Sequence, residues 1–137
     1  MRYLVDANVL SEATRPEPAD EVMGWLTRHE ADLVVDPVIL GELEYGILRL
    51  PVGKKRVALE RWFEQTFATI TCLSFDAKTA RRWARLLCDL HRKDDAMPFK
   101  DSLIAATALE HDLTLVTHNT RDFKRAGVRL LDPFKLH

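Results

Sequence analysis

Short apolar runs alternate with longer helical stretches along this chain, and no other feature restricts its fold as strongly. The runs lie at residues 2–6, 33–35, 70–73, 113–117 and 128–131. Each is short and largely apolar, which is typical of a strand that is buried on both faces. Strands that are separated by helices need crossover connections, so we expect an α/β fold with a mostly parallel central sheet.

The segments between these runs carry the signals of helices. Their patterns predict helices over residues 8–13, 19–29, 37–50, 54–67, 76–92 and 100–111. The clearest begins at Asp36 and Pro37, because Asp is a good N-cap and Pro suits the first helical position. The 137 residues contain no repeat, linker or low-complexity stretch, so we expect a single domain over residues 1–137.

Four acidic residues lie beside or within apolar sequence, where a carboxylate is costly: Asp6, Glu42, Asp101 and Asp122. Asp6 ends the first expected strand and Asp122 follows the fourth, and ligands of parallel α/β sheets bind beyond the carboxyl ends of the strands. Glu42 and Asp101 lie on helix faces that could direct both acids toward the same place. A partly buried carboxylate needs a cation or hydrogen-bond donors, so these acids predict a shared divalent metal ion.

Each of these acids also has a simpler explanation. Asp6 could cap the helix that starts near Asn8, and Asp101 could interact favourably with the dipole of its own helix. Glu42 could be the partner of an arginine, and Asp122 could cap a turn. We favour a metal site because all four acids occur together, in this order of strands and helices.

Composition excludes several classes of protein. The chain is 47% hydrophobic and 30% charged, which is typical of a globular domain and not of a disordered one. No apolar stretch approaches the roughly 18 residues of a membrane span, and there is no signal peptide, so we expect a cytoplasmic protein without membrane contact. The two cysteines, Cys72 and Cys88, lack metal-site spacing, and we interpret them as reduced thiols in the core.

Basic residues gather in two places although the net charge is only −1. The clusters are Lys54-Lys55-Arg56 and the group Arg81, Arg82, Arg85, Arg92 and Lys93. Solvated helix faces explain any single one of these residues best. Contact with phosphates beside an acidic site is the alternative, and it stays open at this point.

The four acids lie in four short motifs that resemble those of a known family. These are VDANVLSE at residues 5–12, GELEYG at 41–46, DSLIAATA at 101–108 and THNTRDF at 117–123. In this order they resemble the PIN-domain proteins, and most of all the VapC/FitB toxins of bacterial toxin–antitoxin pairs. Each motif alone is weak, but the four in order cover essentially the whole chain.

The resemblance implies a Rossmann-like three-layer α/β/α sandwich and an endoribonuclease toxin that depends on Mg²⁺ or Mn²⁺. By the same resemblance, Asp6, Glu42, Asp101 and Asp122 are the catalytic and metal-binding residues. We expect Asp6 and Asp101 to bind the metal directly, since Mg²⁺ keeps several waters. The other two acids would act through water, complete a second metal site or orient the attacking water. Thr117 and Asn119 are candidate polar residues for orienting the site, and a plain turn residue is an equal alternative for Asn119.

The resemblance also implies partners. These are an RNA substrate, a second copy of the chain in a homodimer, and a small antitoxin of the VapB/FitA type, giving a heterotetramer or a larger complex. An arginine or lysine of the antitoxin would enter the acidic site, because a cation pairs well with carboxylates. We expect the dimer surface on the helices near residues 37–63. Trp25, Trp62 and Tyr45 could stack on RNA bases, although core or dimer packing is favoured for the tryptophans.

Three positions depart from the family pattern. Ala7 stands where Thr or Ser is frequent, and Asp36 stands at another Ser or Thr position, where we prefer an N-cap to a fifth acidic neighbour. Lys100 precedes Asp101. Its charged side chain could lower the metal affinity of the site, or it could point away from the site. Two other functions remain as alternatives: a PIN-like module that binds RNA or protein without catalysis, and an aspartate-dependent phosphatase. Asn8 counts against the phosphatase, because such enzymes need an acid there.

Overall fold

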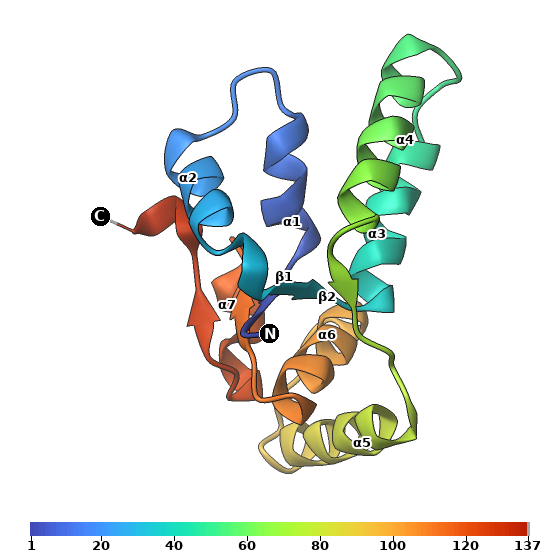
Figure 1. Cartoon of the computed structure of the whole chain (residues 1–137). Coiled ribbons are helices and arrows are strands. Elements are labelled where there is room, and N and C mark those ends of the chain that lie inside the picture. Colours follow the sequence, from blue (N-terminus) through green and yellow to red (C-terminus); the bar gives the residue numbers. More distant parts are fainter. Residues whose placement is uncertain (137) are drawn as a thin grey trace.

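In the computed structural model, which describes residues 1–136, five parallel strands form the central sheet (Figure 1). They are β1 (Tyr3–Val5), β2 (Leu33–Val35), β3 (Thr71–Cys72), β4 (Thr114–Val116) and β5 (Leu130–Leu131). Their order is β3-β2-β1-β4-β5, and each neighbouring pair is parallel. The predicted α/β fold is confirmed. The last residue of the domain predicted over 1–137, His137, lies outside the described residues.

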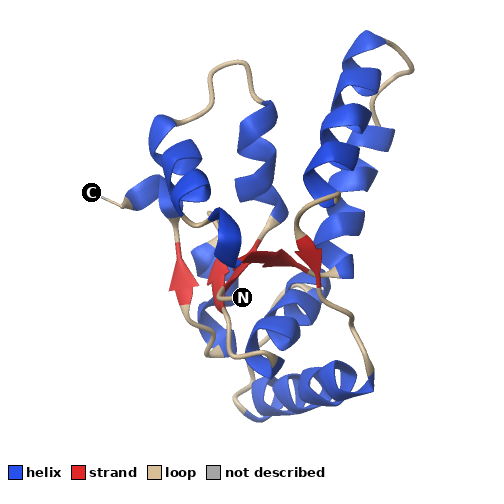
Figure 2. Cartoon of the chain, viewed as in Figure 1, coloured by secondary structure: helices blue, strands red, loops and turns tan. Residues whose placement is uncertain are grey.

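Helices connect the strands and cover the sheet. They are α1 (Ala7–Leu10), α2 (Asp20–Arg28), α3 (Pro37–Leu48), α4 (Lys54–Phe67), α5 (Ala77–Arg92), α6 (Phe99–Glu110) and α7 (Thr120–Phe123). Within the described residues, short 3-10 turns lie at Ser11–Thr14, Glu30–Asp32, Lys124–Ala126 and Pro133–Lys135. Figure 2 shows α1 and α2 above the strands and α5 and α6 below them, as in a three-layer α/β/α sandwich. No helix within residues 1–136 is long and apolar enough to cross a membrane.

The core is centred on the inner strands. All residues of β1 and β2 are buried, and since successive strand residues point to opposite faces, both faces of the sheet are covered there. By contrast, β3 is an edge strand whose two residues are exposed. Cys72 in β3 is exposed for this reason, and Cys88 in α5 is exposed as well. Both are free thiols, and their predicted place in the core is wrong. Cys88 lies off the face of α5 that buries Leu86 and Leu90.

Asp36 fixes the start of α3 and also ties α3 to α6. One carboxylate oxygen accepts a hydrogen bond of 2.9 Å from the backbone N–H of Ile39, and Pro37 follows the cap, so the predicted N-cap is confirmed. The other oxygen accepts a bond of 2.7 Å from the hydroxyl of Thr107 in α6. Burial raises the pKa of Asp36, while these two hydrogen bonds oppose the rise. This acid therefore aligns the two helices that carry Glu42 and Asp101.

Candidate active site

Asp6 lies at the carboxyl end of β1, where α1 begins, and its side chain is held from both sides. One oxygen accepts a hydrogen bond of 2.8 Å from the backbone N–H of Ala7, which makes Asp6 the N-cap of α1. The other oxygen accepts a bond of 2.8 Å from the hydroxyl of Thr117. The capping role that the sequence suggested is thus real, but it uses only one of the two oxygens. The residue is 4% exposed, so its orientation is set by these donors.

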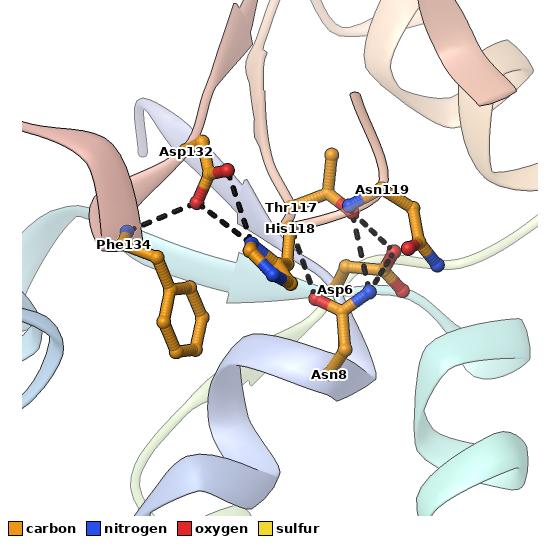
Figure 3. A network of polar contacts seen from close by, with 7 residues as sticks. All are labelled: Asp6, Asn8, Thr117, His118, Asn119, Asp132 and Phe134. Atoms are coloured by element: carbon orange, nitrogen blue, oxygen red, sulfur yellow. Dashed lines mark hydrogen bonds and ion pairs between the residues drawn. The ribbon is translucent and has the colours of Figure 1, made fainter. Parts of the chain in front are cut away.

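A network of polar contacts joins the ends of β1 and β4 around Asp6 (Figure 3). The Thr117 hydroxyl accepts a bond of 3.0 Å from the backbone N–H of Asn119 while donating to Asp6. The amide of Asn8 lies 3.4 Å from both Asp6 and Thr117, and its oxygen accepts 3.1 Å from the N–H of His118. Thr117 therefore orients Asp6 as expected, whereas Asn119 contributes its backbone. Asn8 was missed, although its place two residues after Asp6 was a usable signal.

Repulsion between carboxylates links the four predicted acids electrostatically. Burial, joined by repulsion from Glu42 and Asp101, raises the pKa of Asp6 to about 6 despite the hydrogen bonds from Thr117 and Ala7. Burial also raises the pKa of Asp101, with repulsion from Asp122 and Glu42 in the same direction. We call Asp6, Glu42, Asp101 and Asp122 the acidic cluster.

Lys100 projects toward the acidic cluster and not away from it. Its ammonium forms an ion pair and hydrogen bond with the carboxylate of Glu42. Partial burial lowers the pKa of the Lys100 amine, but attraction to Glu42, Asp101 and Asp6 outweighs this and raises the pKa overall. The ion pair considered for Glu42 therefore exists, with a lysine and not an arginine as its partner.

The acidic cluster suits a hard divalent ion in its chemistry but is not assembled as a ready-made site. Among residues 1–136, no three His, Cys, Asp or Glu side chains converge closely enough to hold a metal. Carboxylate oxygens are nevertheless the ligands that Mg²⁺ and Mn²⁺ prefer, and the repulsion on Asp6 and Asp101 would be relieved by a cation. The assignment of the four acids as metal ligands stays a prediction. Glu42 would have to exchange Lys100 for the ion.

The two basic clusters differ in their surroundings. Arg56, in the first, pairs with Glu60 within α4, as expected for a solvated helix face. The second borders two hollows, one lined by Lys78, Arg81, Arg82, Arg85 and Glu110, and the other by residues that include Arg82, Lys93, Lys124 and Arg125. Both hollows share Arg82, and the basic residues that line them extend from α5 to the turn after α7. Two of these residues have acidic partners, since Lys78 pairs with Glu110 and Arg125 with Asp95. We call these seven basic residues the cationic surface.

Comparison with known proteins identifies the family of this chain. The model of the PIN domain family matches residues 3–128. Toxin FitB of Neisseria gonorrhoeae is 32% identical over 135 residues, spanning 96% of this chain and 97% of FitB. Ribonuclease VapC1 of Rickettsia felis is 33% identical over 125 residues, spanning 91% of this chain and 90% of VapC1. Plasmid stability protein StbB of Pseudomonas syringae pv. tomato is 32% identical over 136 residues, with 96% and 98% covered.

Solved structures share the fold over nearly the whole chain. FitAcB from Neisseria gonorrhoeae superposes with a TM-score of 0.90 at 32% identity, covering 98% of this chain and 99% of that one. VapBC2 from Rickettsia felis, solved with a DNA fragment from its promoter, gives a TM-score of 0.82 at 25% identity, with 96% and 98% covered. The chain therefore belongs to the PIN-domain family and, within it, groups with the VapC and FitB proteins.

Proposed function

We propose that this protein is the toxin of a toxin–antitoxin pair and an endoribonuclease that depends on Mg²⁺ or Mn²⁺. One observation carries the proposal: Asp6 is buried at the carboxyl end of β1, and Glu42 and Asp101 help to raise its pKa to about 6. A buried acid under like-charge repulsion is typical of a catalytic or metal site. The full-length similarity to proteins named ribonuclease and toxin supports the choice of reaction.

The chain's own residues would prepare the site for hydrolysis of an RNA phosphodiester bond. Asp6 and Asp101 would hold the metal directly, while Glu42 and Asp122 would hold it through water or orient the attacking water. A divalent ion, when bound, lowers the pKa of its water and neutralises phosphate charge. Thr117 would keep one oxygen of Asp6 in place from the end of β4. Hydrogen bonds to a metal-binding residue commonly orient that residue and raise the affinity of the site for the metal.

The cationic surface is the proposed path of the RNA strand toward the acidic cluster. It reaches Lys124, two residues after Asp122, and extends along α5 to Lys78. Phosphate contacts supply affinity without sequence preference, so this surface would bind RNA, and the surroundings of the acids would select the cut.

The proposed protein partners are a cognate antitoxin and a second copy of this chain. FitAcB and VapBC2, the solved relatives, are consistent with an antitoxin partner, whose basic side chain would compete with metal for the acids. The α3–α4 pair exposes Tyr45, Leu48, Val52 and Val57, and in Figure 1 its free end stands clear of the sheet. We propose that this pair forms the dimer contact, in the region that the sequence analysis also proposed.

A second candidate function is RNA or protein binding without catalysis. The observation that favours it is the Lys100–Glu42 ion pair, which fills part of the acidic cluster with the protein's own cation. All four acids are nevertheless present, and the single charge of Lys100 does not balance them. We therefore rank the nuclease first.

Cleavage of a mixed cellular RNA pool tests the proposal. Purified protein, freed of antitoxin, is incubated with Mg²⁺, Mn²⁺ or EDTA, and the cut ends are mapped by sequencing. Discrete cuts that need the metal and disappear in Asp6→Asn are expected, whereas Asp20→Asn, at an exposed position in α2, should cut like the wild type. Absence of cutting by folded protein with either metal, or cutting that persists in Asp6→Asn, would overturn the nuclease assignment.

A further inference from the structure

Lys100 connects two helices that each carry one member of the acidic cluster. It is in the first turn of α6, directly before Asp101, and its ammonium reaches Glu42 in α3, 58 residues earlier in the chain. The helices pack against each other, and the buried Asp36–Thr107 hydrogen bond fixes their relative position. The contact is therefore built into the packing of α3 on α6, although the two side chains themselves are partly exposed.

The charge of Lys100 acts on more than its direct partner. Glu42, Asp101 and Asp6 all favour its protonated form. In return, Lys100 opposes the rise in the pKa of Asp101 that burial and the other acids produce. Lys100 is thus a counter-ion for the acidic cluster as a whole. One positive charge does not balance four carboxylates, so the ionised cluster keeps the capacity to attract a divalent ion.

An ammonium and a metal ion cannot use the same carboxylate oxygen at the same time. Lys100 donates its hydrogen bond to Oε2 of Glu42, one of the two oxygens that Glu42 could offer to a metal. A divalent ion bound among these acids would also be repelled by the neighbouring ammonium. The two cations therefore compete for Glu42.

We propose that Lys100 is a tethered counter-ion that competes with the divalent metal, so that metal binding requires Lys100 to release Glu42. The inference rests on the proposed function, since it assumes that the acidic cluster binds a metal. Lys100 is then a positioning residue: it holds Glu42 while the metal is absent and sets the metal concentration at which the site fills.

Binding of Mn²⁺ alone, without RNA, tests this inference. Free Mn²⁺ is titrated by electron paramagnetic resonance for the wild type, Lys100→Met, Lys100→Arg and Lys54→Met. Lys54 is a matched control, because it is an exposed lysine at the start of α4. We expect Lys100→Met to bind Mn²⁺ at least about fivefold more tightly than the wild type, within the usual range of coupling between sites. Lys100→Arg and Lys54→Met should stay near the wild-type value.

The outcomes separate this inference from the proposed function. Equal or weaker Mn²⁺ binding by Lys100→Met, with wild-type binding that Asp6→Asn abolishes, would overturn the role of Lys100 and leave the metal site intact. No binding by any of the variants would overturn both. Thermal unfolding in EDTA supplies a second readout. Lys100→Met should unfold at a lower temperature than Lys54→Met and gain more from added Mn²⁺, and an unchanged midpoint in both conditions would contradict the inference.

Discussion

The two sides of the acidic cluster are held in different ways. Asp6 is 4% exposed, and it accepts hydrogen bonds from a backbone N–H and from Thr117, both fixed by the ends of strands and the start of a helix. The Glu42 side chain is 30% exposed, and its partner Lys100 is 49% exposed. Donors that belong to the scaffold preorganise a ligand, whereas a long exposed side chain exchanges easily. The difference indicates one permanent side of the acidic cluster and one side that the proposed metal would change.

The largest expected effect comes from removing Asp6, the proposed metal ligand on the permanent side. Asp6→Asn should lower the rate of metal-dependent RNA cleavage by about a thousandfold, because losing a metal ligand removes several kcal/mol of charge stabilisation. Glu42→Gln should lower the same cleavage rate by only about tenfold, because Glu42 is proposed to act on the metal through a water molecule. Single-turnover cleavage at saturating Mn²⁺ measures both. A loss in Glu42→Gln as large as that in Asp6→Asn would break the distinction between the two sides.

The raised pKa of Asp6 predicts how the stability of the metal-free protein depends on pH. The carboxyl titrates near 3.8 when unfolded and at about 6 when folded, so folding favours the protonated form. Stability from this group is complete below about pH 4 and is lost as pH rises to about 6, a decrease of about 3 kcal/mol. Urea unfolding in EDTA at a series of pH values measures this slope.

Asp6→Asn is the control for that pH dependence. It should remove most of the slope between pH 4 and 6, and part should remain because the pKa values of Asp36 and Asp101 are raised as well. A slope of the same size in Asp6→Asn would show that Asp6 is not the source of this pH dependence.

Substitution of Thr117 tests whether the hydrogen bond that it donates to Asp6 contributes to metal affinity. Thr117→Val removes the hydroxyl that donates to Asp6 while nearly keeping the volume of a fully buried side chain. Outer hydrogen bonds to metal ligands are commonly worth about 10- to 100-fold, so Mn²⁺ affinity should fall by that range. Thr117→Ser keeps the hydroxyl and should bind nearly as the wild type does. Equal loss in both variants would indicate damaged packing and not a missing hydrogen bond.

The cationic surface should give a smaller effect that depends on salt. RNA binding is measured in the Asp6→Asn background, so that the strand is not cut, at several salt concentrations. Replacing Arg81 and Arg85 by Gln should weaken binding a few-fold and reduce the salt slope by about one for each phosphate that the protein no longer neutralises. The matched control replaces Lys54 and Lys55 by Gln. A larger change in the control would assign the RNA path to α4.

The smallest expected effect concerns folding. Glu42→Gln should change the free energy of unfolding in EDTA by less than about 1 kcal/mol, because partly exposed ion pairs contribute little. It also removes repulsion on Asp6 and Asp101, which offsets the missing attraction to Lys100. Chemical denaturation at pH 7 measures this. A loss of several kcal/mol would mean that the Lys100–Glu42 contact belongs to the permanent structure.

Much of the framework could be predicted because neighbours along the chain decide it. The apolar run before Asp6 specified β1, and the Asp36-Pro37 pair specified the start of α3. The exposure of Cys72 was missed, since its strand looks like the others in sequence but lies at the edge of the sheet. Sequence order does not reveal which strand is at an edge, because that depends on how the crossovers are arranged.

The sequence alone determined the alternation of strands and helices, and with it the placing of Asp6 at a strand end and of Asp101 in the first turn of a helix. Only the tertiary structure decided which groups meet. The bond from Thr117 to Asp6 spans 111 residues and exists because β1 and β4 are parallel neighbours in register. The direction of Lys100 depends on how α6 packs on α3. Local propensity is set over a few residues, whereas contacts between elements depend on the packing of the whole core.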